Sequence, residues 1–474
     1  MIINANLDDG GSDRSEPILQ DTMQSKIRKG SSVVLVIVDA FNAGHTSVYG
    51  YGRPTTPNLE KLAKRGTLFT NWVSNSSWTR PSFATLITGL PKKDHKVELT
   101  NQNLSNKIVT MAEIFRDAGY STAGFVGNPL VRKLWQFDQG FRVYEDTKDH
   151  RAFPRAKILV DKAISWLHRA TRRDRPFFLM VFLTDPHTPY RPVTRHRNYL
   201  EKVGIKENTE YPLKEYKKPL PKAEHDGIVA AYDGEVAYAD EQVGRLVAEL
   251  ETLGKFDDTT VVVTADHGEI FGEHNCYLHG YHMWEPVLRV PFIISSPSLL
   301  AKGQVNDRPH THMDLLPSLA NLAGIAVPDN KPGSSILDAA ATSEKSSDRP
   351  LFSQYNAHGI ERQAARIGRW KLIHHHKVDK RELKKLGNLS RKIPRAKPEN
   401  LPSIAVDGER WELYDLVTDP SEVNDLYRTD SHKPVVNDLK EIIIQFRMDG
   451  SKPMQPPGLS EETLEALQAA GYIR

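Results

Sequence analysis

Three apolar segments of this sequence are followed at once by polar side chains that could bind a cation. The three clusters are Asp39 after residues 32–38, Thr184-Asp185-Pro186-His187 after residues 176–183, and Asp266-His267-Gly268-Glu269 after residues 259–264. Buried strands of open α/β sheets present functional groups at their carboxyl ends. Carboxylates and imidazoles are ligands for hard or borderline divalent ions. A lone aspartate in such a place is commonly a helix cap, but three clusters together predict one shared metal site.

A hydroxyl group that could act as a nucleophile lies in the segment 77–89. The segment reads as a loop leading into a helix, because Pro81 suits a first helical turn and Gly89 suits the helix end. A hydroxyl just before a helix N-terminus lies where backbone N–H groups favour an anion. Thr79 therefore has two interpretations, a helix cap or a nucleophile.

The elements that must position these side chains alternate between strand and helix patterns. Apolar runs at 32–38, 121–126, 176–183, 259–264 and 291–295 alternate with helical patterns at 57–63, 110–118 and 230–253. This alternation predicts an α/β fold in which a mixed sheet lies between helices. After about residue 324 the pattern changes to short strand candidates and a terminal helix candidate at 460–470, which predict a smaller α+β domain.

The composition along the chain predicts four segments. Residues 1–30 are polar and are expected to form a flexible tail. Residues 31–325 are predicted to form the catalytic α/β domain. Residues 326–344 are rich in Pro, Ser, Asp and Lys and are predicted to be a linker, and residues 345–474 the smaller α+β domain.

Charge and cysteine content exclude several classes of protein. The 63 basic and 60 acidic residues give a net charge of +3, which argues against a nucleic-acid partner. The single cysteine, Cys276, excludes an intrachain disulfide and argues against a cysteine-based metal site.

No apolar stretch approaches ~18 residues, so no membrane span is expected. The polar N-terminus lacks the apolar core of a signal peptide, so a cytoplasmic location is expected.

A set of ordered motifs resembles the sulfatase family of the alkaline-phosphatase superfamily over about residues 32–474. The motifs are Val38-Asp39-Ala40, Thr79-Arg80-Pro81-Ser82 with Leu86-Ile87-Thr88-Gly89, Asp185-Pro186-His187-Thr188-Pro189-Tyr190, Tyr232-Asp233-Gly234-Glu235-Val236 with Asp240, Thr264-Ala265-Asp266-His267-Gly268-Glu269, Leu288-Arg289-Val290-Pro291-Phe292, Asp314-Leu315-Leu316-Pro317, and Glu412-Leu413-Tyr414-Asp415-Leu416-Val417-Thr418-Asp419-Pro420 with Glu422. The resemblance implies a metal-dependent ester hydrolase.

The resemblance also implies a metal centre. Asp39, Asp266 and His267 match the family's metal ligands, and Thr79 would lie beside the ion as the nucleophile and a further ligand. Calcium, magnesium, manganese and zinc all suit such a ligand set, in which oxygen dominates and one imidazole is present.

The same resemblance implies contacts with the substrate. His187 would contact the sulfuryl or phosphoryl oxygens, and His279 would face the substrate, with His274 and His282 as competing choices for that role. Asn128 and Arg80 are also predicted to bind the substrate.

Three departures from the family pattern bear on the substrate. Thr79 stands where sulfatases carry the Cys or Ser that is oxidised to formylglycine, Phe83 replaces the usual Arg, and Ala40 replaces a second Asp. Because threonine cannot form the aldehyde, we favour phosphate mono- or diesters over sulfate esters, carried on a small molecule or a glycan. The alternatives are a sulfatase, a transferase of phospho-linked head groups, and a non-catalytic binding protein that kept the fold.

Overall fold

The computed structural model describes residues 30–98, 102–146, 154–173, 175–204, 219–338, 349–357, 360–377 and 409–447. The predicted tail, apart from Gly30, and the helix predicted at 460–470 lie outside the described residues.

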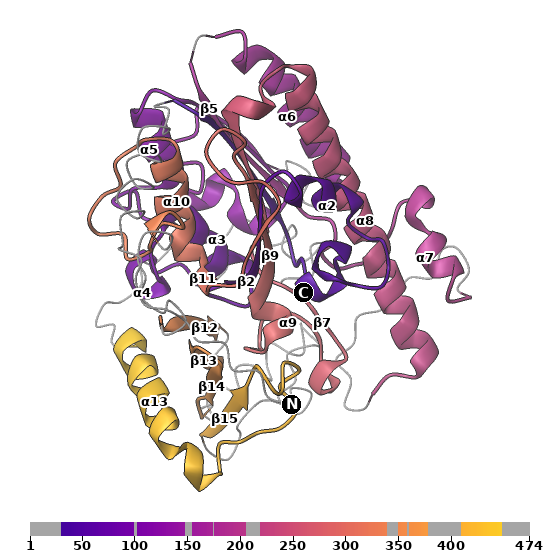
Figure 1. Ribbon diagram of the computed structural model, residues 1–474, viewed down its shortest axis with the longest axis vertical. Coiled ribbons are helices and arrows are strands. Elements are labelled where there is room, and N and C mark those ends of the chain that lie inside the picture. Colours follow the sequence, from indigo (N-terminus) through magenta and orange to yellow (C-terminus); the bar gives the residue numbers. More distant parts are fainter. Residues whose placement is uncertain are drawn as a thin grey trace, which may run out of the picture.

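A nine-stranded mixed sheet forms the centre of the larger part of the molecule (Figure 1). Its middle strand, β1 (Ser32–Val38), pairs in parallel with β5 (Phe177–Leu183) on one side and β6 (Thr259–Ala265) on the other. The strands beyond these two are β3 (Ser121–Val126) and β4 (Val143–Glu145) next to β5, and β9 (Arg289–Ser295), β2 (Thr67–Val73), β10 (Gln304–Asn306) and β11 (His310–Thr311) next to β6. Strand β9 is antiparallel to both of its neighbours, which makes the sheet mixed.

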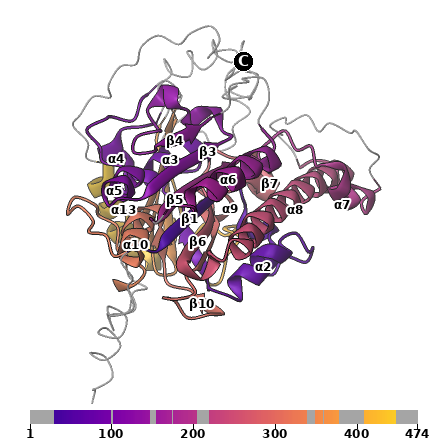
Figure 2. The same ribbon diagram turned by 90° about the horizontal axis from the view of Figure 1, so that it is seen from above.

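Helices cover both faces of this sheet (Figures 1 and 2). One face carries α2 (Pro57–Ala63), α6 (Ala156–Ala170) and α8 (Lys222–Thr252), and the other carries α3 (Thr79–Thr88), α5 (Met111–Asp117) and α10 (Leu315–Leu322). The central strands are therefore buried on both sides, which explains why their sequences are continuous apolar runs. The predicted α/β class, with a mixed sheet between helices, is confirmed.

Short elements complete this part of the chain. They are α4 (Lys92–His95), α7 (Asn198–Glu201), α9 (Glu285–Leu288), and the hairpin of β7 (Ile270–Phe271) and β8 (Tyr277–Leu278).

A four-stranded antiparallel sheet with one helix follows, as the sequence predicts for the C-terminal region. Its strands are β12 (Leu351–Ala357), β13 (Ile360–Ile367), β14 (Trp370–His375) and β15 (Arg410–Asp415), and its helix is α13 (Lys433–Arg447). Leu372 and Leu413 on one face of the sheet pack with Leu439 and Ile443 of α13.

The opposite face of the C-terminal sheet packs on the larger part of the molecule. Ile360 and Ile373 belong to one apolar cluster with Trp78 and Leu130. The link is also polar, because the amide of Gln354 donates to the Asn75 carbonyl at 2.9 Å. Strand β12 therefore supports the loop that leads into α3.

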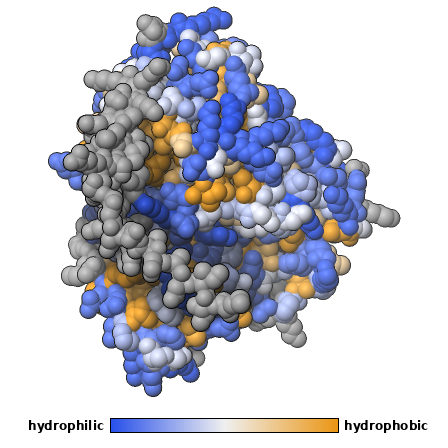
Figure 3. Space-filling view, in the orientation of Figure 1, coloured by the Kyte–Doolittle hydropathy of each residue, from blue (hydrophilic) through white to orange (hydrophobic). Residues whose placement is uncertain are grey.

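The face of the molecule drawn in Figure 3 is largely polar. Hydrophilic side chains predominate on it, and hydrophobic ones lie in separate small groups. Among the described residues, every helix falls short of the length and apolarity that a bilayer crossing demands.

Candidate active site

The register of the central strands brings the predicted site residues together. Val38 lies opposite Leu183 on one side and Ala265 on the other, so the next position on each strand is Asp39, Thr184 or Asp266. The amide of Asp39 continues this pattern by donating to the Leu183 carbonyl at 2.9 Å. The three polar clusters thus meet at one edge of the sheet because their apolar strands are neighbours in it.

Asp39, Asp266 and His267 form a compact group of potential metal ligands. Each offers one ligand atom, and these atoms all lie within 4.8 Å of one another. The Nε2 atom of His267 is 3.4 Å from Asp266 Oδ2 and 3.7 Å from Asp39 Oδ1. Its Nδ1 lies 2.9 Å from the Gly268 carbonyl and donates to it, so the Nε2 lone pair of the neutral ring faces the carboxylates.

The electrostatics of this group favour a cation. Burial, and then the charge of Asp266, raises the pKa of Asp39 well above its usual range, and burial raises the pKa of Asp266 to about 7. Burial also lowers the pKa of His267 well below its ordinary value. Asp39 Oδ1 and Asp266 Oδ2 are buried and receive no hydrogen bond from the described residues. Because a buried carboxylate oxygen without a partner is costly, this donor set fits a divalent ion.

Thr79 is the first residue of α3, and its hydroxyl faces the metal-ligand group. Its Oγ1 lies 3.3 Å from His267 Nε2 and 3.5 Å from Asn128 Nδ2. The residue that precedes the helix is Trp78, which is extended and makes no side-chain cap. The helix-cap interpretation of Thr79 therefore does not describe this structure, and the hydroxyl lies at a helix N-terminus suited to an anion.

Asn128, predicted to contact the substrate, makes its strongest contact with Asp39. Its Nδ2 donates to Asp39 Oδ2 at 2.6 Å, while its Oδ1 accepts from the Leu130 amide at 2.8 Å. These two bonds fix the orientation of the amide. Asn128 thus holds Asp39 in place while presenting the same Nδ2 to Thr79.

Of the three histidines that competed for the substrate-facing role, the structure places His279 at the site. Its ring centroid lies 4.4 Å from that of His267 and 5.0 Å from that of His187. His274 and His282 instead stack on Trp284, with centroid distances of 3.8 and 4.8 Å.

Two residues to which the motifs assigned no role hold His279 in position. Its Nδ1 lies 3.0 Å from Glu269 Oε1, and Glu269 Oε2 accepts from the Tyr190 hydroxyl at 2.9 Å. Glu269 directly follows the Asp-His-Gly motif, so its place in the sequence could have identified it as a residue of the site. We infer that Glu269 is a positioning residue that directs His279 Nε2 toward the site.

We expect Glu269→Gln to lower kcat roughly ten- to hundredfold, the scale seen when residues that orient functional histidines are lost. KM should change less, because the amide fills the same buried space and only the orientation of His279 is weakened. Steady-state kinetics of the purified variant tests this. Tyr190→Phe serves as the control, since it keeps the carboxylate and should cost less. If kcat/KM falls only because KM rises, and kcat stays unchanged, the positioning role would be contradicted.

His312 is a further residue that the sequence analysis did not select. It accepts at Nδ1 from Trp72 Nε1 at 3.1 Å, so its Nε2 donates to the Asp266 carbonyl at 2.9 Å. Its sequence position, 46 residues after Asp266, gave no signal of this contact.

Arg80 lies differently from its predicted role as a substrate contact. Its buried guanidinium donates to the carbonyls of Leu130, at 2.7 Å, and Gln102, and it lies over the ring of Trp135. These contacts join α3 to the segments that contain Gln102, Leu130 and Trp135. We therefore assign Arg80 a structural role in place of the predicted contact with the substrate.

Comparison with known proteins identifies the family of this chain. The family model described as sulfatase matches residues 31–325, and a model described as the C-terminal region of N-sulphoglucosamine sulphohydrolase matches residues 272–392. An uncharacterized sulfatase, YidJ, from Escherichia coli (strain K12) is 26% identical over 70% of this chain and 74% of its own. The N-sulphoglucosamine sulphohydrolase of Homo sapiens is 25% identical over 93% of this chain and 94% of its own.

Solved structures share the fold. A protein in complex with its substrate D-glucosamine-2-N,6-O-disulfate has a TM-score of 0.73 at 19% identity and covers 89% of this chain and 98% of its own. A phosphonate monoester hydrolase of Agrobacterium radiobacter has a TM-score of 0.66 at 20% identity, over 88% and 95% of the two chains. Because the sulfatase model spans more than half of the sequence and covers every residue of the site built above, this chain belongs to the sulfatase family.

Proposed function

We propose that this sulfatase-family hydrolase cleaves phosphate mono- or diesters, with Thr79 as the nucleophile. The observation that carries the proposal is the position of the Thr79 hydroxyl, at the start of α3 and 3.3 Å from His267 Nε2. A divalent ion held by Asp39, Asp266 and His267 would lower the pKa of this hydroxyl and supply positive charge to the ester oxygens.

The proposed reaction has two displacements at phosphorus. In the first, Thr79 Oγ1 gives up its proton and bonds to phosphorus while the bond to the leaving alcohol breaks. In the second, water gives up a proton as it attacks phosphorus, the bond to Thr79 Oγ1 breaks, and that oxygen regains a proton as the phosphate product leaves. The departing alkoxide must gain a proton, and we assign this transfer to His279, whose ring centroid lies 4.4 Å from that of His267, with His187 beside it at 5.0 Å.

The surroundings of Phe83 support a phosphate ester over a sulfate ester. A formylglycine hydrate can release sulfate by collapsing to the aldehyde, a route that a threonine adduct lacks. Phe83 stands where the family carries the Arg that holds this group, and its buried ring stacks on Phe182 with centroids 5.1 Å apart and planes 9° apart. The position therefore offers an apolar ring in place of a cation.

A sulfate ester is the second candidate, because the relatives compared above are named as sulfatases. One structural neighbour binds a sulfated glucosamine, which makes a glycan ester a natural form of either substrate. A transferase remains the alternative if an alcohol replaces water in the second displacement.

Side-by-side turnover of aryl phosphate, bis-aryl phosphate and aryl sulfate by the metal-loaded enzyme tests the proposal. We expect one or both phosphate esters to be cleaved faster than the sulfate, and a chelated sample to be inactive. Faster cleavage of the sulfate would overturn the proposed substrate class. Adding an alcohol acceptor and measuring alkyl phosphate separates transfer from hydrolysis, while inactivity toward all three esters would favour a binding protein.

A further inference from the structure

The end of the C-terminal sheet carries a second group of metal-ligating side chains. Gln363 of β13 and Trp411 of β15 lie opposite His374 of β14, which is two residues before His376. The same register continues for His376, whose amide donates to the Glu361 carbonyl at 3.2 Å. Since alternate residues of a strand share a face, His374 and His376 point to the same side of the sheet.

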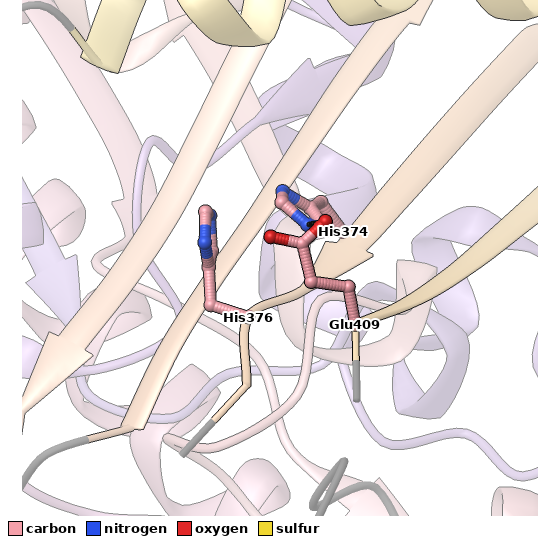
Figure 4. A group of neighbouring side chains, drawn as sticks. All are labelled: His374, His376 and Glu409. Carbon is pink, nitrogen blue, oxygen red and sulfur yellow. Dashed lines mark ion pairs between the residues drawn. The ribbon is translucent and has the colours of Figure 1, made fainter. Parts of the chain in front are cut away.

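Three side chains from this region converge. One imidazole nitrogen of His374, one of His376 and a carboxylate oxygen of Glu409 all lie within 4.8 Å of one another. Figure 4 shows the carboxylate of Glu409 turned toward the two imidazole rings, whose centroids are 3.8 Å apart. His374 Nε2 is 3.5 Å from Glu409 Oε2, and His376 Nε2 is 3.7 Å from Glu361 Oε1, so a second carboxylate borders the group.

The face on which the group lies separates it from the catalytic centre. His374 stacks on Trp411, with centroids 3.6 Å apart and planes 5° apart, and Trp411 packs with the apolar side chains under α13. His375, between the two histidines, points to the opposite face, where its Nε2 lies 3.2 Å from Glu412 Oε1. The group is therefore built on the α13 side of the sheet, whereas the opposite side packs toward Trp78 and the start of α3.

We propose that His374, His376 and Glu409 bind a divalent transition ion of the Zn²⁺ class, separate from the catalytic ion. Two imidazoles and one carboxylate are a ligand set that suits Zn²⁺ and leaves a fourth position for water or Glu361. The two histidines are almost fully buried, while the side chain of Glu409 is 55% exposed and gives the ion access from solvent. Such an ion joins the ends of β14 and β15, so it stabilises the sheet that supports the α3 loop.

The test uses the full chain carrying Asp39→Ala and Asp266→Ala, which removes the catalytic ligands. After chelation and dialysis, this variant is titrated with Zn²⁺ alone in a calorimeter, and one equivalent is expected to bind. Adding His374→Ala and His376→Ala should abolish that binding. His168→Ala is the matched control, because His168 also pairs with a glutamate, Glu249, at 2.9 Å on the surface, and it should leave zinc binding unchanged.

Two further measurements keep the proposal testable if the buried histidine variants fail to fold. Glu409→Gln is made in the chain that keeps Asp39 and Asp266, and it alters a half-exposed side chain. It should lower the zinc affinity of one binding site by about tenfold or more. Bound Cu²⁺ should quench tryptophan fluorescence in the Asp39→Ala, Asp266→Ala chain, because Trp411 stacks on His374. Absence of zinc binding in that chain, or full zinc affinity after Glu409→Gln, would overturn the site.

Discussion

Thr79→Ala is expected to lower turnover by about 10⁴-fold or more while the protein stays folded. The alanine removes the hydroxyl group that lies 3.3 Å from His267 Nε2 at the start of α3. Losing a nucleophile that works with the rest of its site costs this much in well-studied hydrolases. A helix cap, by contrast, is worth about 1 kcal/mol of stability and little turnover. Melting temperature and kcat measured on the same sample separate these outcomes.

Substitutions that keep or change the hydroxyl sharpen this test. Thr79→Ser should retain a good part of the activity, because only the methyl group is lost. Thr79→Cys should stay poor toward phosphate esters, and sulfatase activity should stay poor even where formylglycine is generated, because Phe83 is a buried ring among aromatic neighbours. A stable and fully active alanine variant would rule out the nucleophile and leave a metal-bound water as the attacking group.

The sequence was sufficient to predict the site wherever an apolar strand ends in a ligand. The runs before Asp39 and Asp266 predicted buried strands, and the observed parallel register places these two side chains side by side. Thr79 could be predicted from Pro81 and the helix that follows it. Each of these signals is local, because the strand or helix and the functional residue are adjacent in the chain.

What the sequence could not show are contacts that depend on the packing of distant segments. Tyr190 and Glu269 are 79 residues apart, and their hydrogen bond depends on how the loop after β5 folds back over the site. Strand β2 was not predicted, because its sequence mixes threonine and asparagine with apolar residues and its burial pattern is only partly alternating. Strand β15 and helix α13 were also not predicted, and their apolar side chains Leu413, Leu439 and Ile443 are buried in one cluster with residues of β12, β13 and β14.

Several motif residues turned out to support the fold around the site. Asp240 accepts hydrogen bonds from the amides of Asn58 and Leu59 at the start of α2. Asp314 forms a bidentate ion pair with Arg349, whose two terminal guanidinium nitrogens donate to the two carboxylate oxygens at 2.7 and 2.8 Å. A family signature therefore mixes chemistry with architecture, and only the geometry distinguishes the two.

Asp266→Asn is expected to abolish metal-dependent turnover and to remove the effect of chelation on stability. The amide keeps the shape of the side chain but removes one of two buried carboxylates, so a ligand is lost and the ion binds weakly. In the absence of metal, the unaltered protein holds Asp39 and Asp266 close together; burial raises the pKa of both groups, and the charge of Asp266 further raises that of Asp39. The variant lacks this repulsion, so under chelation it should melt at the same temperature as the unaltered protein or above it.

When the activating metal is added, the unaltered protein should melt at a higher temperature than Asp266→Asn. Ligand binding to the folded state stabilises it by RT ln(1 + [L]/Kd), so the melting temperature of the unaltered protein rises with metal concentration. That of Asp266→Asn should stay nearly constant over the same range. Asn128→Ala is a useful comparison, because it removes the 2.6 Å hydrogen bond to Asp39 without removing a ligand and should only weaken the response. An Asp266→Asn protein with full activity and an unchanged metal response would contradict the assignment of Asp266 as a ligand.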